Sequence, residues 1–226
     1  MITKQMEKAL EKHKGLFSES QVTDDIDVVG ILLRAGDEKI AWQFVKESDF
    51  KIAQKKNKQD NTVAAVAAWN GNVWFLEKMH ESGLDLSHPS ISIYGARHLP
   101  VLEFLLSSGN LDVNAKGEDG FTPLQQATNV SSSFYPVVDR EVEAVRLGCI
   151  DFLLQNGADV NASNDFGRTA AMSAAYIGAS VILELLLRYG ADASDNLRCN
   201  EGKSTLDYAD GEDTVALLKG RGGKIH

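Results

Sequence analysis

Four residues near the C-terminus have the types that phosphate binding requires, but their surroundings do not complete the motif. Gly202-Lys203-Ser204-Thr205 has the ending of a phosphate-binding loop. That loop also needs a glycine five residues before Gly202, where this chain has Leu197. The same four residues fall on a repeated phrase described below, and the repeat explains them better than nucleotide binding does.

The other residues that could do chemistry are too scattered to form a recognisable site. No histidine pair has the His-x-x-x-His spacing, no cysteine lies at ligand spacing from a histidine, and no Gly-x-Ser-x-Gly elbow is present. The acidic pairs Asp24-Asp25 and Glu212-Asp213 lie near expected helix starts, where carboxylates stabilise the helix dipole. We therefore expect no enzyme activity, no metal or other cofactor and no small-molecule substrate. The five histidines are His13, His80, His88, His98 and His226.

The net charge argues against nucleic acid as the partner. The formal charge of the 226 residues is -9 at pH 7, and such a surface repels phosphate backbones. The basic run Lys51, Lys55, Lys56 and Lys58 lacks interleaved aromatic residues, so it is better explained as a solvated face. The excess of acidic residues is consistent with high solubility or with a partner that has a basic patch.

Cysteine use and hydropathy indicate an intracellular protein. Cys149 and Cys199 form no paired motif, and free thiols explain them better than a disulfide. No apolar segment approaches the ~18–20 residues that cross a membrane. The first residues also lack the apolar stretch of a signal peptide. We expect a cytoplasmic protein without membrane contact.

A repeated phrase is the main signal of the sequence. Two leucines or their equivalents are followed by two residues, a glycine, a small or apolar residue and an aspartate. Gly157 and Gly190 of the two clearest copies are 33 residues apart (190 minus 157). The copies span 32–37, 78–85, 105–114, 153–161 and 186–192.

A second phrase lies between copies of the first and has the features of a helix start. It begins with glycine, any residue and threonine, and ends in alanine; the clearest copies span 120–127 and 167–175, with degenerate copies at 60–68 and 202–209. Threonine caps helix N-termini, and proline is tolerated at the first helical position. Ile150, Leu153 and Leu154 recur at helical spacing, and the glycine that follows suits a left-handed helix stop. Together the phrases predict helix, short turn, helix, glycine stop and loop.

A 33-residue period with a Thr-Pro-Leu-x-x-Ala phrase resembles the ankyrin repeat. The resemblance implies an all-α solenoid of about five to six helix-turn-helix repeats with degenerate terminal caps. Residues 1–59 would form N-terminal capping helices and a degenerate repeat, with 24–35 as its second helix. Residues 60–195 would form ankyrin repeats, and 196–226 a C-terminal capping repeat with a basic tail.

Two segments depart from the repeat. Residues 87–98 lack the Thr-Pro-Leu phrase, so that repeat is degenerate in its first helix. From Gly120 to Gly167 there are 47 residues (167 minus 120), which exceeds the period. The excess lies near 129–143, where serines and a proline indicate a loop or a broken helix junction. A tolerated insertion and a partner-binding loop both explain it.

The resemblance also implies where a partner binds: at the loop tips and on the exposed side of the first helix of each repeat. Aromatic residues and arginine are frequent interface hot spots. The alternative is that each aromatic residue packs on its neighbouring repeat. Leu105, Leu106, Leu153, Leu154, Leu186 and Leu187 are instead expected in the core. The predicted partner-binding residues are Trp69, Asn70, Asp119, Phe121, Asn129, Phe134, Tyr135, Phe166, Arg168, Tyr176 and Lys203.

These observations predict a non-catalytic protein-binding module. A dedicated binder or inhibitor of one protein, of the immunity, antitoxin or adaptor type, is the first hypothesis. A general scaffold or host-directed effector with several weak partners is the alternative. An enzyme with an unrecognised site and a nucleic-acid binder that uses the lysine run are less favoured, since no motif supports either.

Overall fold

The computed structural model describes residues 7–8, 11–12, 24–57, 61–129, 140–194 and 196–221. All regular elements in these ranges are helices, which confirms the expected all-α class. The chain divides into two compact units, which are described separately. Unit 1 comprises Met1–Gly95 and Pro100–Leu111, and unit 2 comprises Ala96–Leu99 and Asp112–His226.

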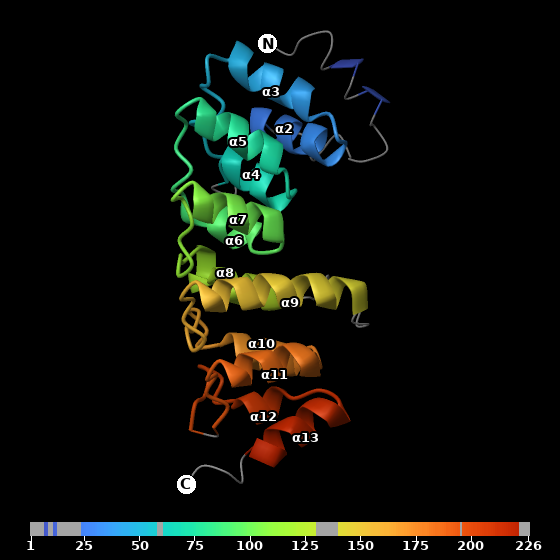
Figure 1. Ribbon diagram of the computed structural model, residues 1–226, viewed down its shortest axis with the longest axis vertical. Coiled ribbons are helices and arrows are strands. Elements are labelled where there is room, and N and C mark those ends of the chain that lie inside the picture. Colours follow the sequence, from blue (N-terminus) through green and yellow to red (C-terminus); the bar gives the residue numbers. More distant parts are fainter. Residues whose placement is uncertain are drawn as a thin grey trace. The chain divides into compact units, whose positions relative to one another are not determined.

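Unit 1 contains three helix pairs (Figure 1). The first helices of the pairs form a row, because α2 packs against α4 and α4 packs against α6. Short turns join the two helices of each pair. The pairs are α2 (Asp25–Arg34) with α3 (Glu38–Glu47), α4 (Val63–Trp69) with α5 (Val73–Glu81), and α6 (Pro89–Gly95) with α7 (Leu99–Ser107).

Unit 2 contains three further pairs, so the described residues hold six, in agreement with the five to six expected (Figure 1). An inner row is formed by α8, α10 and α12, and an outer row by α9, α11 and α13. A short 3-10 turn, η3 (Glu118–Gly120), precedes α8. The pairs are α8 (Pro123–Thr128) with α9 (Arg140–Gln155), α10 (Ala170–Tyr176) with α11 (Ser180–Arg188), and α12 (Thr205–Tyr208) with α13 (Glu212–Arg221).

The second repeated phrase starts helices as predicted. Thr62, Thr122 and Thr169 accept a hydrogen bond on the side-chain oxygen from the backbone N–H three residues later, at 3.1 to 3.3 Å. Ser204 does the same at the start of α12. Each cap satisfies one of the N–H groups that have no partner inside the helix. Ser204 of the apparent phosphate-loop motif is thus a helix cap.

The glycine stops also have the predicted backbone. Gly157 and Gly190 follow the second helix of their pairs with φ of 90° and 89°. Side chains other than glycine adopt this left-handed region only at a cost, so the glycine ends the helix without strain.

One copy of the first phrase lies at a different place in its repeat from the one predicted. The sequence predicts a second helix over 24–35, but α2 is the first helix of its pair because it packs against α4. Gly36, with φ of 78°, lies in the short turn between α2 and α3. Gly71 and Gly178 occupy the same kind of turn with similar φ values. Both kinds of turn need a left-handed residue, so the local phrase does not distinguish them.

The two segments that depart from the repeat pattern, 87–98 and the extra residues near 129–143, differ in structure. The segment without the Thr-Pro-Leu phrase still forms α6, and His88 Nδ1 lies 2.6 Å from Ser90 Oγ at its start. In the extra segment, expected near 129–143, α8 ends at Thr128 and α9 already begins at Arg140. Residues 140–143 are therefore helical, and 130–139 lie outside the described residues.

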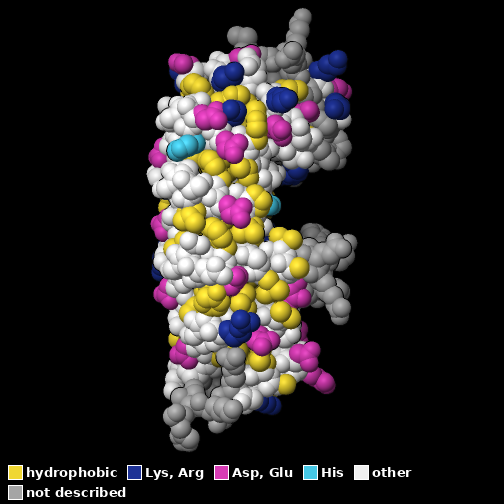
Figure 2. Space-filling view, viewed as in Figure 1, with side chains coloured by type: hydrophobic (Ala, Val, Ile, Leu, Met, Phe, Trp, Pro, Cys, Tyr) yellow, Lys and Arg dark blue, Asp and Glu magenta, His cyan; other side chains and the backbone are white. Residues whose placement is uncertain are grey.

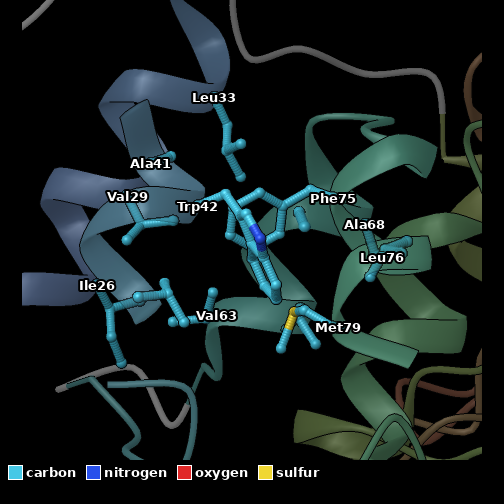
Figure 3. Packing of buried hydrophobic residues seen from close by; sticks show 14 of the residues in the cluster. Ile26, Val29, Leu33, Ala41, Trp42, Val63, Ala68, Phe75, Leu76 and Met79 are labelled. Atoms are coloured by element: carbon cyan, nitrogen blue, oxygen red, sulfur yellow. The ribbon is translucent and has the colours of Figure 1, made fainter. Parts of the chain in front are cut away.

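The core of unit 1 is formed by apolar side chains from all three helix pairs, and Figure 3 shows those of α2, α3, α4 and α5. Trp42 meets Phe75 edge-on, with ring centroids 5.4 Å apart. The repeated alanines are buried as predicted; Ala64, Ala68, Ala170 and Ala174 expose 1% or less. They allow neighbouring helices to approach closely.

The predicted leucine core is confirmed at Leu105, Leu153, Leu154, Leu186 and Leu187. Leu106 is an exception, since it exposes 45% of its surface. Successive helical residues point about 100° apart, so two adjacent leucines do not face the core equally. Leu154 and Leu187 lie at the edge of the buried stripe, and Leu106 lies beyond it.

Candidate partner-binding surface

Four loops between successive pairs are closed by the same backbone hydrogen bond, and we call them fingers. The N–H of one residue donates to the C=O of the residue four positions later, at 2.9 to 3.0 Å. Several predicted binding residues therefore share one structural position, the accepting end of a finger. The donor and acceptor residues are Asn57 and Asn61 in unit 1, and Gly117 and Phe121, Asn164 and Arg168, and Cys199 and Lys203 in unit 2.

The fingers of unit 2 are bonded to one another. Asp165 donates its N–H to the carbonyl of Asp119 at 2.9 Å, and Asn200 donates its N–H to the carbonyl of Phe166 at 3.0 Å. The Asn200 side chain also donates to the carbonyl of Asp165 at 2.8 Å. Two predicted residues, Asp119 and Phe166, are thus held by the finger that follows each of them.

A cluster of charged and aromatic side chains surrounds Tyr208, and we call it the Tyr208 cluster. The Arg168 guanidinium lies 5.4 Å from the ring centroid and the Lys203 ammonium 5.3 Å from it. Tyr176 meets the same ring edge-on at 6.2 Å. Glu201 forms ion pairs with both cations, at 3.3 Å from Lys203. The cluster therefore brings together three residues that the sequence predicted separately: Arg168, Tyr176 and Lys203.

The electrostatics of the Tyr208 cluster favour binding over proton transfer. Hydrogen bonds from Arg168 and then Lys203 lower the pKa of the Glu201 carboxyl. Burial, followed by the hydrogen bond with Cys199, raises the pKa of the Tyr208 hydroxyl. Both shifts move the pKa of the group further from pH 7, whereas an acid–base catalyst needs a pKa near the working pH. The cluster can offer an aromatic surface with fixed charges to another molecule.

The predicted binding residues of unit 2 differ in exposure. Tyr176 exposes 65% of its surface and Phe166 47%, although the core needs neither. Asp119 is exposed, whereas Phe121 and Asn129 are half-buried. Phe134 and Tyr135 lie outside the described residues. Among the described members of the predicted set in this unit, Phe166 and Tyr176 are therefore the most accessible aromatic residues.

The two remaining predicted residues lie in unit 1. Trp69, at the end of α4, exposes 42% and meets Tyr94 edge-on at 5.2 Å. The Asn70 side chain caps the same helix by donating to the carbonyl of Val66 at 2.8 Å. The predicted residues thus divide between the two units.

Tyr208 itself was not predicted as a binding residue. Aligning the caps Thr169 and Ser204 places Tyr208 at the position of Ser173. The sequence does contain a signal for Tyr208, because this position holds an aromatic residue where the preceding repeat has the small residue Ser173.

Charged and hydrophobic side chains are mixed on the face that Figure 2 displays. Hydrophobic side chains gather there in patches that acidic and basic residues separate. The outer-row residues Val145 and Val181 expose 56% and 48%, so exposed apolar surface is not confined to the predicted binding residues. Lys55 of the basic run pairs with Asp25 at 3.6 Å, and Lys58 lies outside the described residues.

Successive helix pairs whose first helices pack in a row, with hydrogen-bonded fingers between pairs, define a helical repeat protein. The family model for ankyrin repeats (3 copies) matches residues 142–225. The chain therefore contains ankyrin repeats, as its sequence predicted.

Three curated relatives share one segment of similarity with this chain. Neurogenic locus notch homolog protein 1 of Mus musculus, Rattus norvegicus and Homo sapiens is 33% identical to it over 109 residues. The match covers 48% of this chain and 4% of the length of each relative. The similarity therefore concerns about half of this chain and a small part of those proteins.

Ankyrin repeats indicate a protein–protein interaction module, and they are in general not catalytic. Among the described helices, none combines the length and the hydropathy that a membrane crossing requires.

Proposed function

We propose that this protein is a dedicated, non-catalytic binder of one protein partner, which it inhibits or recruits at equal stoichiometry in the cytoplasm. The observation that carries the proposal is the exposure of Phe166 and Tyr176 beside the charged Tyr208 cluster. Aromatic side chains that leave water on association supply much of the binding energy of interfaces. Ion pairs already hold the Arg168 and Lys203 side chains, so little further ordering is needed when a partner binds.

Charge at the finger tips supports a partner with a basic surface. Glu118, Asp119 and Asp165 are exposed, and none forms an ion pair with another described residue. The carboxyl of Glu201, by contrast, is already paired with two cations. Lysine or arginine side chains of a partner would meet the free tip carboxylates while its apolar surface covers Phe166 and Tyr176. Complementary charge of this kind accelerates association and excludes wrong partners. The same acidic tips disfavour nucleic acid.

A general scaffold or host-directed effector with several weak partners is the second candidate. It is favoured by the exposure of Trp69 in unit 1, since a second aromatic surface could bind a second protein. The two candidates differ in the number of partners and in their affinity.

Capture of partners from native lysate with the full chain as bait distinguishes them. Wild type is compared with a Phe166→Ala/Tyr176→Ala variant and with Val145→Ala/Val181→Ala, which truncates equally exposed side chains on the outer row. Circular dichroism verifies that each bait is folded.

The dedicated-binder proposal expects one protein at near-equal stoichiometry, lost with the first variant and retained with the second. That protein's activity or localisation should then change on stoichiometric addition of the chain. Several substoichiometric proteins would favour the scaffold, and equal loss with both variants would overturn the proposed surface.

A further inference from the structure

Unit 1 contains a groove of about 300 Å³ between the first helices of its pairs. The close approach of α2 and α4 forms its floor. A Cβ atom added to Gly30 would lie 3.0 Å from Val66 Cγ1, so the absence of a side chain at residue 30 lets the helices meet there. The lining of the groove includes Asp27, Ile31, Arg34, Val66, Trp69 and Tyr94.

The middle of the groove is apolar and aromatic. Ile31 and Val66 line it, and the edge-on pair of Trp69 and Tyr94 forms one wall. Trp69 keeps 42% of its surface exposed, although indole is among the side chains that gain most from burial. A large apolar side chain from outside would therefore find a preformed surface to cover.

The charge of the groove is asymmetric. Asp27 and Arg34 lie seven residues apart on α2, which places them about 10 Å apart along the helix axis. The Asp27 carboxylate already accepts the N–H of Asp24 at 3.2 Å in the helix cap. Arg34 is exposed, and it forms no ion pair with any residue that the structure describes. Asp27 places a negative charge toward one end of the groove, and the guanidinium toward the other end is the charged group that no described residue pairs.

We propose that this groove binds a peptide segment of a partner protein in which a large apolar side chain stands next to a carboxylate. The apolar side chain covers Trp69, Ile31 and Val66, and the carboxylate pairs with Arg34. A guanidinium matches a carboxylate with two parallel hydrogen bonds, which gives directional recognition. The site goes beyond the proposed function, because it lies in unit 1 and selects the opposite charge from the finger tips of unit 2.

A phage-displayed library of random heptapeptides, selected against the full chain, tests this site. Wild type should enrich peptides that place Asp or Glu beside Leu, Met, Phe or Trp. Arg34→Glu should lose that preference and enrich Lys or Arg instead. Arg188→Glu is the matched control, because Arg188 is likewise an exposed arginine in the last turn of its helix, in unit 2. It should select the same peptides as wild type.

Titration of one selected peptide by fluorescence anisotropy then measures how much Arg34 and Trp69 each contribute to binding. Arg34→Glu and Trp69→Ala should each weaken binding about tenfold or more, and a lysine at the acidic position of the peptide should restore binding to Arg34→Glu. Phe166→Ala/Tyr176→Ala should bind the peptide as wild type does, so the result is independent of the surface in unit 2. Selection without an acidic preference, or equal binding by wild type and Arg34→Glu, would overturn the proposal.

Discussion

Asp192 donates its backbone N–H to the side-chain oxygen of Asn161, 2.8 Å away, across two successive repeats of unit 2. The Asn161 amide in turn donates to the carbonyl of Gly190 at 3.2 Å. Asn114 makes the same pair of bonds with Asp159 and Gly157, at 2.8 and 3.1 Å. The asparagine that ends one copy of the repeated phrase therefore binds the glycine and aspartate of the next copy, and the phrase is a joint between repeats.

Asn161→Ala should destabilise unit 2 by removing both bonds of one joint. Each hydrogen bond contributes about 0.5–1.5 kcal/mol, so the loss of two should lower the unfolding free energy by about 1–3 kcal/mol. Urea unfolding followed by circular dichroism measures the change. Asn110→Ala is the control, because among the described residues the Asn110 amide binds Ser108 of its own turn and no neighbouring repeat. Equal losses in the two variants would show that the joint adds nothing beyond a local turn.

Gly120→Ala should cost more stability than Gly157→Ala. Both glycines have left-handed backbones, with φ of 72° and 90°, and alanine costs about 1–2 kcal/mol in that region. A Cβ atom on Gly120 would also lie 3.0 Å from the backbone nitrogen of Asp165, whereas nothing lies within 4 Å of one on Gly157. The first substitution therefore adds a clash between fingers to the backbone strain.

Urea midpoints of the two variants separate the clash from the strain. We expect Gly120→Ala to lose at least about 1 kcal/mol more than Gly157→Ala. If Gly157→Ala were the more destabilised variant, the close contact between the fingers of Asp119 and Asp165 would not be a stabilising feature.

The parts of the fold that the sequence predicted are those that local physics decides. A threonine oxygen reaches the N–H three residues later whatever the rest of the chain does, so the caps at Thr122 and Thr169 follow from two short phrases. A glycine stop such as Gly157 follows in the same way. The error at Gly36 has the same origin, because a left-handed residue serves the turn within a pair and the turn between pairs equally well. Only the packing of α2 on α4 decides between them.

The sequence predicts which positions contribute to the candidate site, but it does not predict which side chains contact one another. Arg168, Tyr176 and Lys203 were found because the repeat places them beside a finger glycine or after the alanines. The contacts of Arg168 and Tyr176 with Tyr208 depend on how two repeats stack, because these residues lie 40 and 32 positions before it (208 minus 168 and 208 minus 176). No pattern within one repeat specifies that distance. The division of the chain at residues 59 and 195 stays a prediction for the same reason, because it was drawn from local phrases.

Gln125→Leu should destabilise unit 2 more than any exposed glutamine substitution. Gln125 is buried, and its amide donates to the carbonyls of Ala162 at 3.1 Å and Arg168 at 2.6 Å. Its side-chain oxygen accepts the N–H of Thr122 at 3.0 Å. Leucine would leave polar groups at this position without partners, at a cost of about 1–3 kcal/mol.

The urea midpoint of Gln125→Leu tests this cost against Gln155→Leu, which changes an exposed residue of α9. Surface changes of that kind stay within about 0.5 kcal/mol. A Gln125→Leu variant as stable as wild type would mean that α8 and the finger of Arg168 do not depend on this bridge.

The two free cysteines should differ in their reactivity toward Ellman's reagent in the native protein. Burial raises the pKa of the Cys149 thiol to about 11, against a smaller opposing effect of the Arg146 charge. Burial also acts to raise the pKa of Cys199, but hydrogen bonds from the Tyr208 hydroxyl, 3.3 Å away, and from backbone groups outweigh it and lower the pKa. Because the thiolate is the reactive form, Cys199 should be modified first near pH 8.

Tyr208→Phe isolates the cause of this difference. Without the hydroxyl, the pKa of Cys199 should rise, so its modification near pH 8 should slow several-fold, whereas the rates of wild type and variant should converge as the pH approaches 10. Reaction rates across this pH range, with mass spectrometry to identify the modified residue, provide the measurement. Denaturant should make Cys149 and Cys199 react alike, because both then lose their surroundings. Faster native modification of Cys149, or a Tyr208→Phe variant with an unchanged pH profile, would show that the hydroxyl does not control the thiol.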